Sequence, residues 1–178
     1  MTSSGEIDLR MKQLWEEKLP LKIRIFLWML WHDRILTGEQ RQKRKGRGSE
    51  KCKYCDKLET RNHLFFNCNI VQVKRVWVRV SLRWGKRPIL VTHFQDMIGS
   101  VEVMRDNNFA YIILAAVAWS LWKVRNDLVF NNVLIKSPKA INYMIVGFLT
   151  QWTKMQKEKN GLLMEDLVLK LKEGLRAW

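Results

Sequence analysis

The sequence is poor in residues that interrupt regular structure. Nine glycines and three prolines among 178 residues are few for a fold with many strands and turns, so a turn-rich all-β architecture is disfavoured. Three cysteines cannot pair into a closed set of disulfides, which argues against a secreted disulfide scaffold. The longest stretch without a charged residue covers 16 residues, 107–122. A membrane span needs about 20, so we expect a buried helix there and no membrane span.

Acidic residues are also scarce: 17 Asp and Glu face 32 Lys and Arg, which gives a formal net charge of +15. This charge suits a polyanionic partner, and it also keeps a tryptophan-rich chain soluble. The first residues contain no apolar signal core, and their mixture of acidic and basic side chains is unlike a transit peptide. We therefore expect a reducing compartment, either the cytoplasm or the nucleus.

Helical periodicity is the dominant pattern of the chain. Thr37 and Ser137 stand where helix N-caps are expected. Apolar residues recur at three- and four-residue steps over residues 20–36, 61–84, 107–130, 137–158 and 163–175, and shorter helices are expected after Thr37 and over 94–104. We predict an all-α fold, a six- to seven-helix bundle with an embedded CCHC zinc-knuckle-like loop. The expected organisation is a tail at 1–13, a zinc-binding helical region at 14–85, and a helical extension at 86–178 packed on it.

All three cysteines fall within 17 residues, in the pattern Cys52-x2-Cys55-x7-His63-x4-Cys68. Zinc takes four thiolate or imidazole ligands in a tetrahedron, and a C-x-x-C turn presents two of them together. We predict one structural Zn²⁺, because four protein ligands leave no open coordination position for catalysis. The alternative is three buried free thiols beside a capping histidine.

The same residues lie within a longer set of motifs. Pro20, Lys22, Phe26 and Trp28 fit P-x-K-x-x-x-F-x-W, and residues 33–37 are similar to D-R-L-x-T, with Ile35 in place of Leu. Residues 59–68 fit E-T-x-x-H-L-F-x-x-C and precede a V-W pair, and residues 119–130 are similar to W-x-I-W-x-x-R-N-x-x-x-F, with Leu121 in place of Ile. In this order, the motifs resemble the zinc-binding domain that follows the reverse transcriptase in plant non-LTR (LINE-type) retrotransposon polyproteins.

The resemblance implies that the cysteines and His63 are metal ligands, and that the domain helps to grip template RNA or target DNA. It carries over no catalytic residue, since the sequence contains no Y-A-D-D-like polymerase motif and no spaced acidic set of a nuclease. We expect a free-standing, retroelement-derived protein that is not an enzyme and has no small-molecule substrate.

Two basic clusters flank the predicted zinc loop. Their side chains are suited to holding phosphates, and Tyr54 is placed to stack on a nucleobase. The first cluster comprises Arg41, Lys43, Arg44, Lys45, Arg47, Lys51 and Lys53, and the second includes Arg75, Arg79 and Arg83, whose four-residue spacing places them on one helix face. An ordinary solvated helix face is the alternative for the second cluster.

Two functions follow from these features. The first is sequence-nonspecific binding of RNA or DNA, which would weaken steeply with salt. The second is a protein-interaction module or self-association, in a host or selfish (toxin/antidote-like) role, with zinc purely structural and the charge serving solubility. A salt-tolerant protein complex would favour the second.

Overall fold

A computed structural model describes residues 12, 14–69, 73–83, 110–135 and 137–176. In these residues the regular secondary structure is helical, apart from one isolated β-bridge, and the predicted all-α fold is confirmed. The elements in chain order are α2 (Leu21–Trp31), α3 (Gly38–Lys43), the π-helical turn η1 (His63–Asn67), α4 (Val73–Arg83), α6 (Ala110–Asn131), α7 (Pro138–Thr153) and α8 (Glu158–Arg176). The helix predicted over 94–104 lies outside the described residues.

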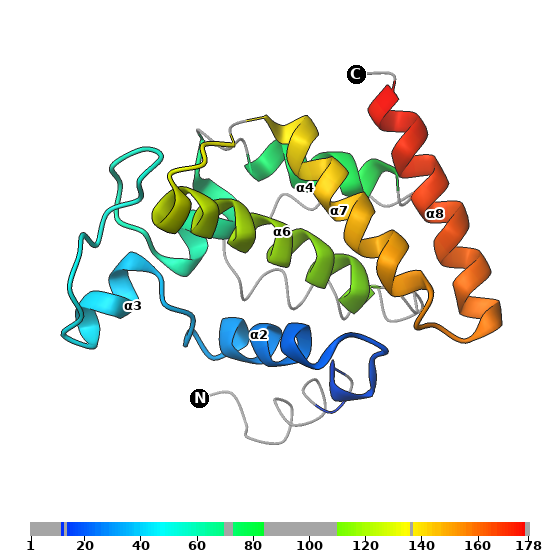
Figure 1. The fold of residues 1–178 in the computed structure, drawn as a ribbon, viewed down its shortest axis with the longest axis horizontal. Helices are drawn as coiled ribbons and strands as arrows, with labels where there is room; N and C mark the ends of the chain where they lie inside the picture. The colour runs from blue at the N-terminus through cyan, green and yellow to red at the C-terminus, as the bar shows by residue number, and fades with distance from the viewer. Residues whose placement is uncertain (1–11, 13, 70–72, 84–109, 136, 177–178) are drawn as a thin grey trace.

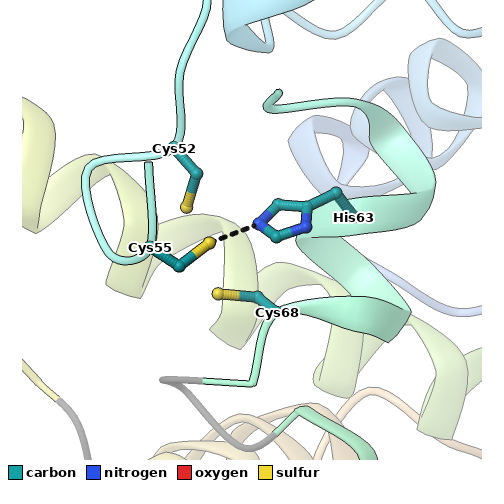
Figure 2. A group of neighbouring side chains, drawn as sticks. All are labelled: Cys52, Cys55, His63 and Cys68. Atoms are coloured by element: carbon teal, nitrogen blue, oxygen red, sulfur yellow. Dashed lines mark hydrogen bonds between the residues drawn. The ribbon is translucent and has the colours of Figure 1, made fainter. Parts of the chain in front are cut away.

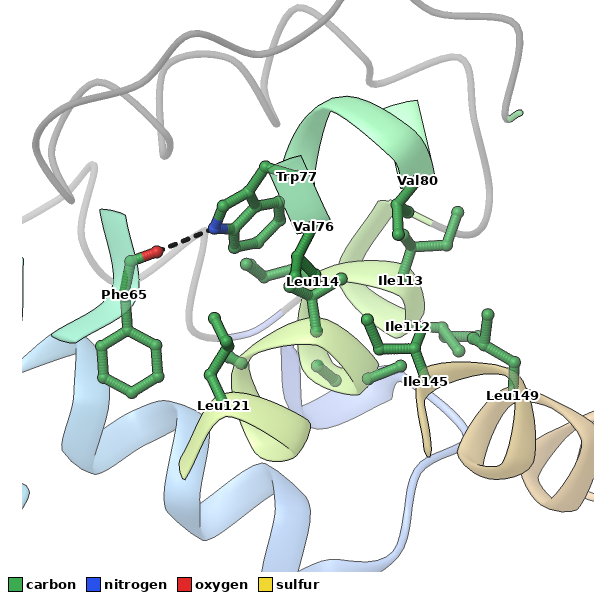
Figure 3. Packing of buried hydrophobic residues seen from close by; sticks show 14 of the residues in the cluster. Phe65, Val76, Trp77, Val80, Ile112, Ile113, Leu114, Leu121, Ile145 and Leu149 are labelled. Atoms are coloured by element: carbon green, nitrogen blue, oxygen red, sulfur yellow. Dashed lines mark hydrogen bonds between the residues drawn. The ribbon is translucent and has the colours of Figure 1, made fainter. Parts of the chain in front are cut away.

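Helix α6 is the centre of the molecule (Figure 1). It contacts α2 on one side and α4, α7 and η1 on others, while α8 packs against α7 and α4. Its first three turns are buried almost all round because they carry mainly Ala, Ile, Leu and Val. The core between these helices includes Val76 and Val80 of α4 and Ile112 and Ile113 of α6 (Figure 3). Within the described part of the chain, no helix has the length and hydrophobicity of a membrane span.

The predicted helix starts at Thr37 and Ser137 are confirmed. The Thr37 hydroxyl accepts a hydrogen bond from the Gln40 amide, and the Ser137 hydroxyl accepts one from Ala140. These bonds satisfy amides at the helix N-termini that have no partner within the helix.

Helix α2 ends at Trp31, five residues before the predicted end. The backbone of Asp33 is left-handed, with φ of 53°, so the helix cannot continue through it. The Arg61 guanidinium donates to the carbonyl oxygens of Leu30 and Trp31, each at 2.9 Å, and so caps the helix end.

The predicted break at Asn160 and Gly161 is wrong. Helix α7 ends at Thr153, and α8 begins at Glu158 with Gly161 in its first turn. The turn between the helices is tight: the amides of Met155 and Gln156 donate to Trp152 and Thr153, each at 3.0 Å. Gly161 does not end a helix, because the start of a helix also tolerates glycine.

Candidate metal centre

A short turn between residues 51 and 58 presents the first two cysteines. Lys51 and Leu58 form an antiparallel bridge that closes the turn. Inside it, the Cys52 amide donates to the Lys57 carbonyl at 2.7 Å, and the Asp56 amide donates to the Cys52 carbonyl at 2.9 Å. Asp56 adopts a left-handed φ of 62°, which short polar side chains tolerate. These bonds fix the backbone that carries both thiols.

The other two candidate ligands come from η1. Thr60 starts this segment, since its hydroxyl accepts from the His63 amide at 2.9 Å. His63 opens the π-helical turn, and Cys68 follows it with extended dihedrals, φ −72° and ψ 108°. The Trp77 indole donates to the carbonyl of Phe65 at 2.8 Å (Figure 3).

The helix predicted over 61–84 is therefore wrong as one continuous element. The π-turn and the extended Cys68 interrupt it, and α4 begins only at Val73. A regular helix would turn residues five apart to different faces, whereas this geometry turns both Cys68 and His63 toward the loop (Figure 2). π-Turns occur frequently at functional sites.

The structure brings the four predicted metal ligands together: Cys52, Cys55, His63 and Cys68. Their ligand atoms all lie within 4.8 Å of one another (Figure 2). Cys55 Sγ lies 3.2 Å from His63 Nε2. Tetrahedral zinc at about 2.3 Å from each sulfur places sulfurs about 3.8 Å apart. The cluster therefore fits one zinc ion with only small adjustments.

Burial and charge also suit a structural ion. Cys52, Cys68 and His63 are 1%, 2% and 7% exposed. The pKa of Cys52 is raised to about 12, first by its hydrogen bond with Cys68 and then by burial. The protein alone thus keeps this thiol neutral at pH 7, and a cation must displace its proton to bind the thiolate. When bound, zinc would cross-link the loop to η1.

A buried ion pair between Glu59 and Arg125 connects the end of the zinc-binding turn to α6. Arg125 of α6 and Glu59 are 3% and 2% exposed, and Arg125 Nη2 lies 2.7 Å from Glu59 Oε1. The same oxygen accepts from the Gly38 amide at 2.7 Å. Arg125 also donates to the Leu36 carbonyl at 3.3 Å and lies over the Trp122 ring at 5.0 Å.

Sequence reasoning missed this pair. Glu59 and Arg125 both belong to the motifs that carry the family resemblance, and their positions in two separate motifs were the available signal. Nothing local marks them as partners, because they lie 66 residues apart.

The loop also contacts the end of α6. The Tyr54 hydroxyl donates to the Val124 carbonyl at 3.2 Å, and Lys53 Nζ donates to that of Val129 at 3.4 Å. Tyr54 is half-buried against the hydrophobic core, and burial raises its pKa. Tyr54 thus packs against α6, and its stacking on a nucleobase stays a prediction.

The predicted basic residues around the loop differ in their contacts with the protein. Arg41 is half-buried: its guanidinium donates to the Ser49 carbonyl at 2.7 Å, and its side chain packs beside Gly46. Lys43 is exposed but paired with Glu39 at 2.7 Å. The remaining side chains of this cluster are exposed, and we refer to them as the basic segment: Arg44, Lys45, Arg47, Lys51 and Lys53.

Arg75 and Arg79 of the second basic cluster differ in exposure. Arg75 of α4 is exposed, whereas Arg79 is half-buried in a hollow lined by Asn142 and Val146 of α7 and Leu171 of α8. Arg83 is the last residue of α4. Helices α7 and α8 cover part of the face that the sequence pattern left open.

The geometry first defines a class: an all-α protein with a closed zinc site of three cysteines and one histidine. Residues 1–77 match the model of the family described as zinc-binding in reverse transcriptase. This range contains all four candidate ligands, and the resemblance seen in the motifs is confirmed.

The similarity to known proteins extends beyond this range. The chain is 26% identical over 171 residues to a putative ribonuclease H protein of Arabidopsis thaliana. The alignment covers 93% of this chain and 26% of that protein, so the chain spans about a quarter of the relative's length. No solved structure matches the chain.

Proposed function

We propose that this protein is a non-enzymatic, zinc-stabilised module that binds RNA or DNA without sequence preference. The observation that carries the proposal is the position of the basic segment. Its five side chains are exposed, and the segment leads directly into the turn that presents Cys52 and Cys55. A zinc ion that fixes this turn also fixes where the positive charges stand. Preorganised cations bind a phosphate backbone with less loss of entropy than mobile ones.

The proposal of a non-enzymatic role rests on the chemistry of the site. Four protein side chains converge on one point, three of them buried. A zinc ion with four protein ligands has no position for water or substrate, and such ions stabilise folds. The relative is named as a putative ribonuclease H protein, and this chain aligns with only about a quarter of it.

Fluorescence anisotropy against salt tests the proposal. Labelled single-stranded RNA and duplex DNA of unrelated sequences should bind the zinc-loaded chain, with affinity that falls steeply as salt rises. The variant Lys45→Gln/Arg47→Gln/Lys51→Gln should reduce the slope of log affinity against log salt by about 2 to 3, since each phosphate contact contributes about 0.7 to 0.9.

A matched control removes three exposed lysines, two from the turn between α7 and α8 and one from α8: Lys154→Gln/Lys157→Gln/Lys172→Gln. It changes the net charge equally and should leave the slope within about 0.5 of that of the unmodified protein. Equal effects of the two triple variants would contradict a defined surface, and no salt-dependent binding at all would refute the proposal.

One observation favours protein interaction as a second candidate. Phe130, Val133 and Leu134 stand together where α6 ends, and they are 71%, 49% and 51% exposed. Exposed apolar groups of this size are typical of contact surfaces. In this case the affinity for a protein partner would depend little on salt. Phe130→Ser would weaken the complex, whereas the basic triple variant would not.

A further inference from the structure

An aromatic and cationic corner lies where α2 ends, on the side of α2 that leads to α3 (Figure 1). The ring of His32 lies against Trp28, with centroids 4.7 Å apart and planes inclined by 38°. The Arg34 guanidinium lies over the same indole at 5.0 Å. His32 and Arg34 are exposed, and Trp28 is half-buried. Three planar groups thus lie close together at one point of the surface.

The His32 ring is held in a fixed orientation. Its Nδ1 lies 2.9 Å from the carbonyl oxygen of Trp28, one helical turn earlier. Since a carbonyl only accepts, Nδ1 carries the proton in this bond. A ring fixed at one edge and supported on one face by an indole offers an exposed aromatic surface without further ordering.

The corner is continuous with the basic segment. Arg44 Nη2 donates to the carbonyl of Arg34 at 3.1 Å, which joins the two surfaces directly. The acidic neighbour, Asp33, does not oppose them: its carboxylate accepts from Gln40 at 2.8 Å and lies 3.6 Å from the Arg61 guanidinium. The local charge toward solvent is therefore positive.

We propose that this corner is a stacking site for an unpaired nucleobase, and that the preferred ligand is a single strand. The inference rests on the proposed function and specifies its substrate class. Phosphates of the strand contact the basic segment, and one base stacks on His32 with Arg34 beside it. Aromatic rings and guanidinium planes stack on bases of any identity, whereas a duplex keeps its bases paired and covered.

The first test separates the contribution of the base to affinity from that of the phosphates. The probes are labelled oligothymidylate and an abasic DNA strand of equal length, titrated with the zinc-loaded chain. The unmodified protein should prefer oligothymidylate by about tenfold, the effect of one stacked base. His32→Ala should lose this preference and keep its affinity for the abasic strand. His32→Phe should retain it, because it keeps a ring.

His32→Lys and Trp15→Ala are the controls. His32→Lys introduces a cation without a ring and should not restore the preference. Trp15 is an exposed tryptophan that precedes α2, and the Arg24 guanidinium lies over its ring at 5.8 Å. It therefore offers a similar pair of aromatic and cationic groups outside the corner. Trp15→Ala should leave the preference unchanged.

The outcomes distinguish the two proposals. If neither strand binds in a salt-dependent manner, the proposed function itself fails. If both strands bind equally well to the unmodified protein, or if His32→Ala keeps the preference, nucleic-acid binding stands and the stacking site is refuted. Rescue by His32→Lys but not by His32→Phe would also refute stacking, since it would mean a phosphate contact.

Discussion

At the scale of single residues, Glu59 connects three parts of the protein. Its carboxylate accepts from Arg125 of α6 and from the Gly38 amide that starts α3, while its backbone follows the zinc turn. Gly38 itself has no room for a side chain, because a Cβ there would lie 2.5 Å from the carbonyl oxygen of Glu50. Removing one member of a buried ion pair leaves a charge without compensation, which costs more than removing both.

We expect Arg125→Met to destabilise the protein by about 3 to 5 kcal/mol, because it leaves the Glu59 carboxylate buried without its cation. Urea unfolding of the zinc-loaded chain measures this change. The double variant Glu59→Gln/Arg125→Met should recover part of the loss, since it buries no net charge. A cost below about 1 kcal/mol for Arg125→Met would show that the pair contributes little.

Glu17 provides a pH-dependent prediction. Burial, and then the neighbouring charge of Glu16, raise its pKa from 4.5 to about 7. Between these values the folded protein holds a proton that the unfolded chain has released, so this contribution to stability falls as pH rises. Glu17→Gln should therefore stabilise the protein at about pH 8, by about 1 kcal/mol after solvent screening, and give no gain at about pH 4.

Thermal unfolding at the two pH values measures the effect of Glu17→Gln. The exposed neighbour gives the control: Glu16→Gln removes only the repulsion between the two carboxylates and should gain less at the higher pH. An equal gain from Glu17→Gln at both pH values would contradict the raised pKa.

At the scale of elements, the zinc turn and η1 depend on the ion more than the helices do. The turn between residues 51 and 58 is short and mostly exposed, and η1 has only five residues. Helices α6, α7 and α8, in contrast, bury extensive apolar faces against one another. Chelation should therefore release the metal region while the helices stay folded.

Hydrogen exchange with and without a strong chelator measures this difference. Amides of residues 50–69 should lose protection, and those of α6 and α7 should change little. Cys55→Ser should reproduce the pattern without chelator, because it removes one ligand. Equal protection with and without chelator, or loss of protection throughout the chain, would contradict a local structural ion.

The sequence predicted those features that local spacing determines. The four candidate ligands lie within 17 residues, and the caps at Thr37 and Ser137 act on amides three residues away. It did not predict the break at Cys68, because apolar residues keep a helical spacing across it. The spacing of Arg75 and Arg79 predicts that they belong to one helix. Their exposure depends on α7 and α8, which pack against α4 but lie far from it in the sequence.

At the scale of the whole molecule, α6 joins the zinc region to the C-terminal helices. Its first turns are buried among α4 and α7. Its last turns receive Tyr54 and the Glu59 carboxylate. The residues that match the zinc-binding family, 1–77, thus share one core with residues beyond them. The basic segment leads into the zinc turn, which contacts this core.

Native mass spectrometry of the full chain, purified without chelator, tests the central claim most directly. We predict one zinc ion per chain, absent from Cys52→Ser and His63→Ala and retained in His32→Ala, whose imidazole lies outside the cluster. A well-folded protein that carries no zinc, or zinc that persists in both ligand variants, would contradict the account.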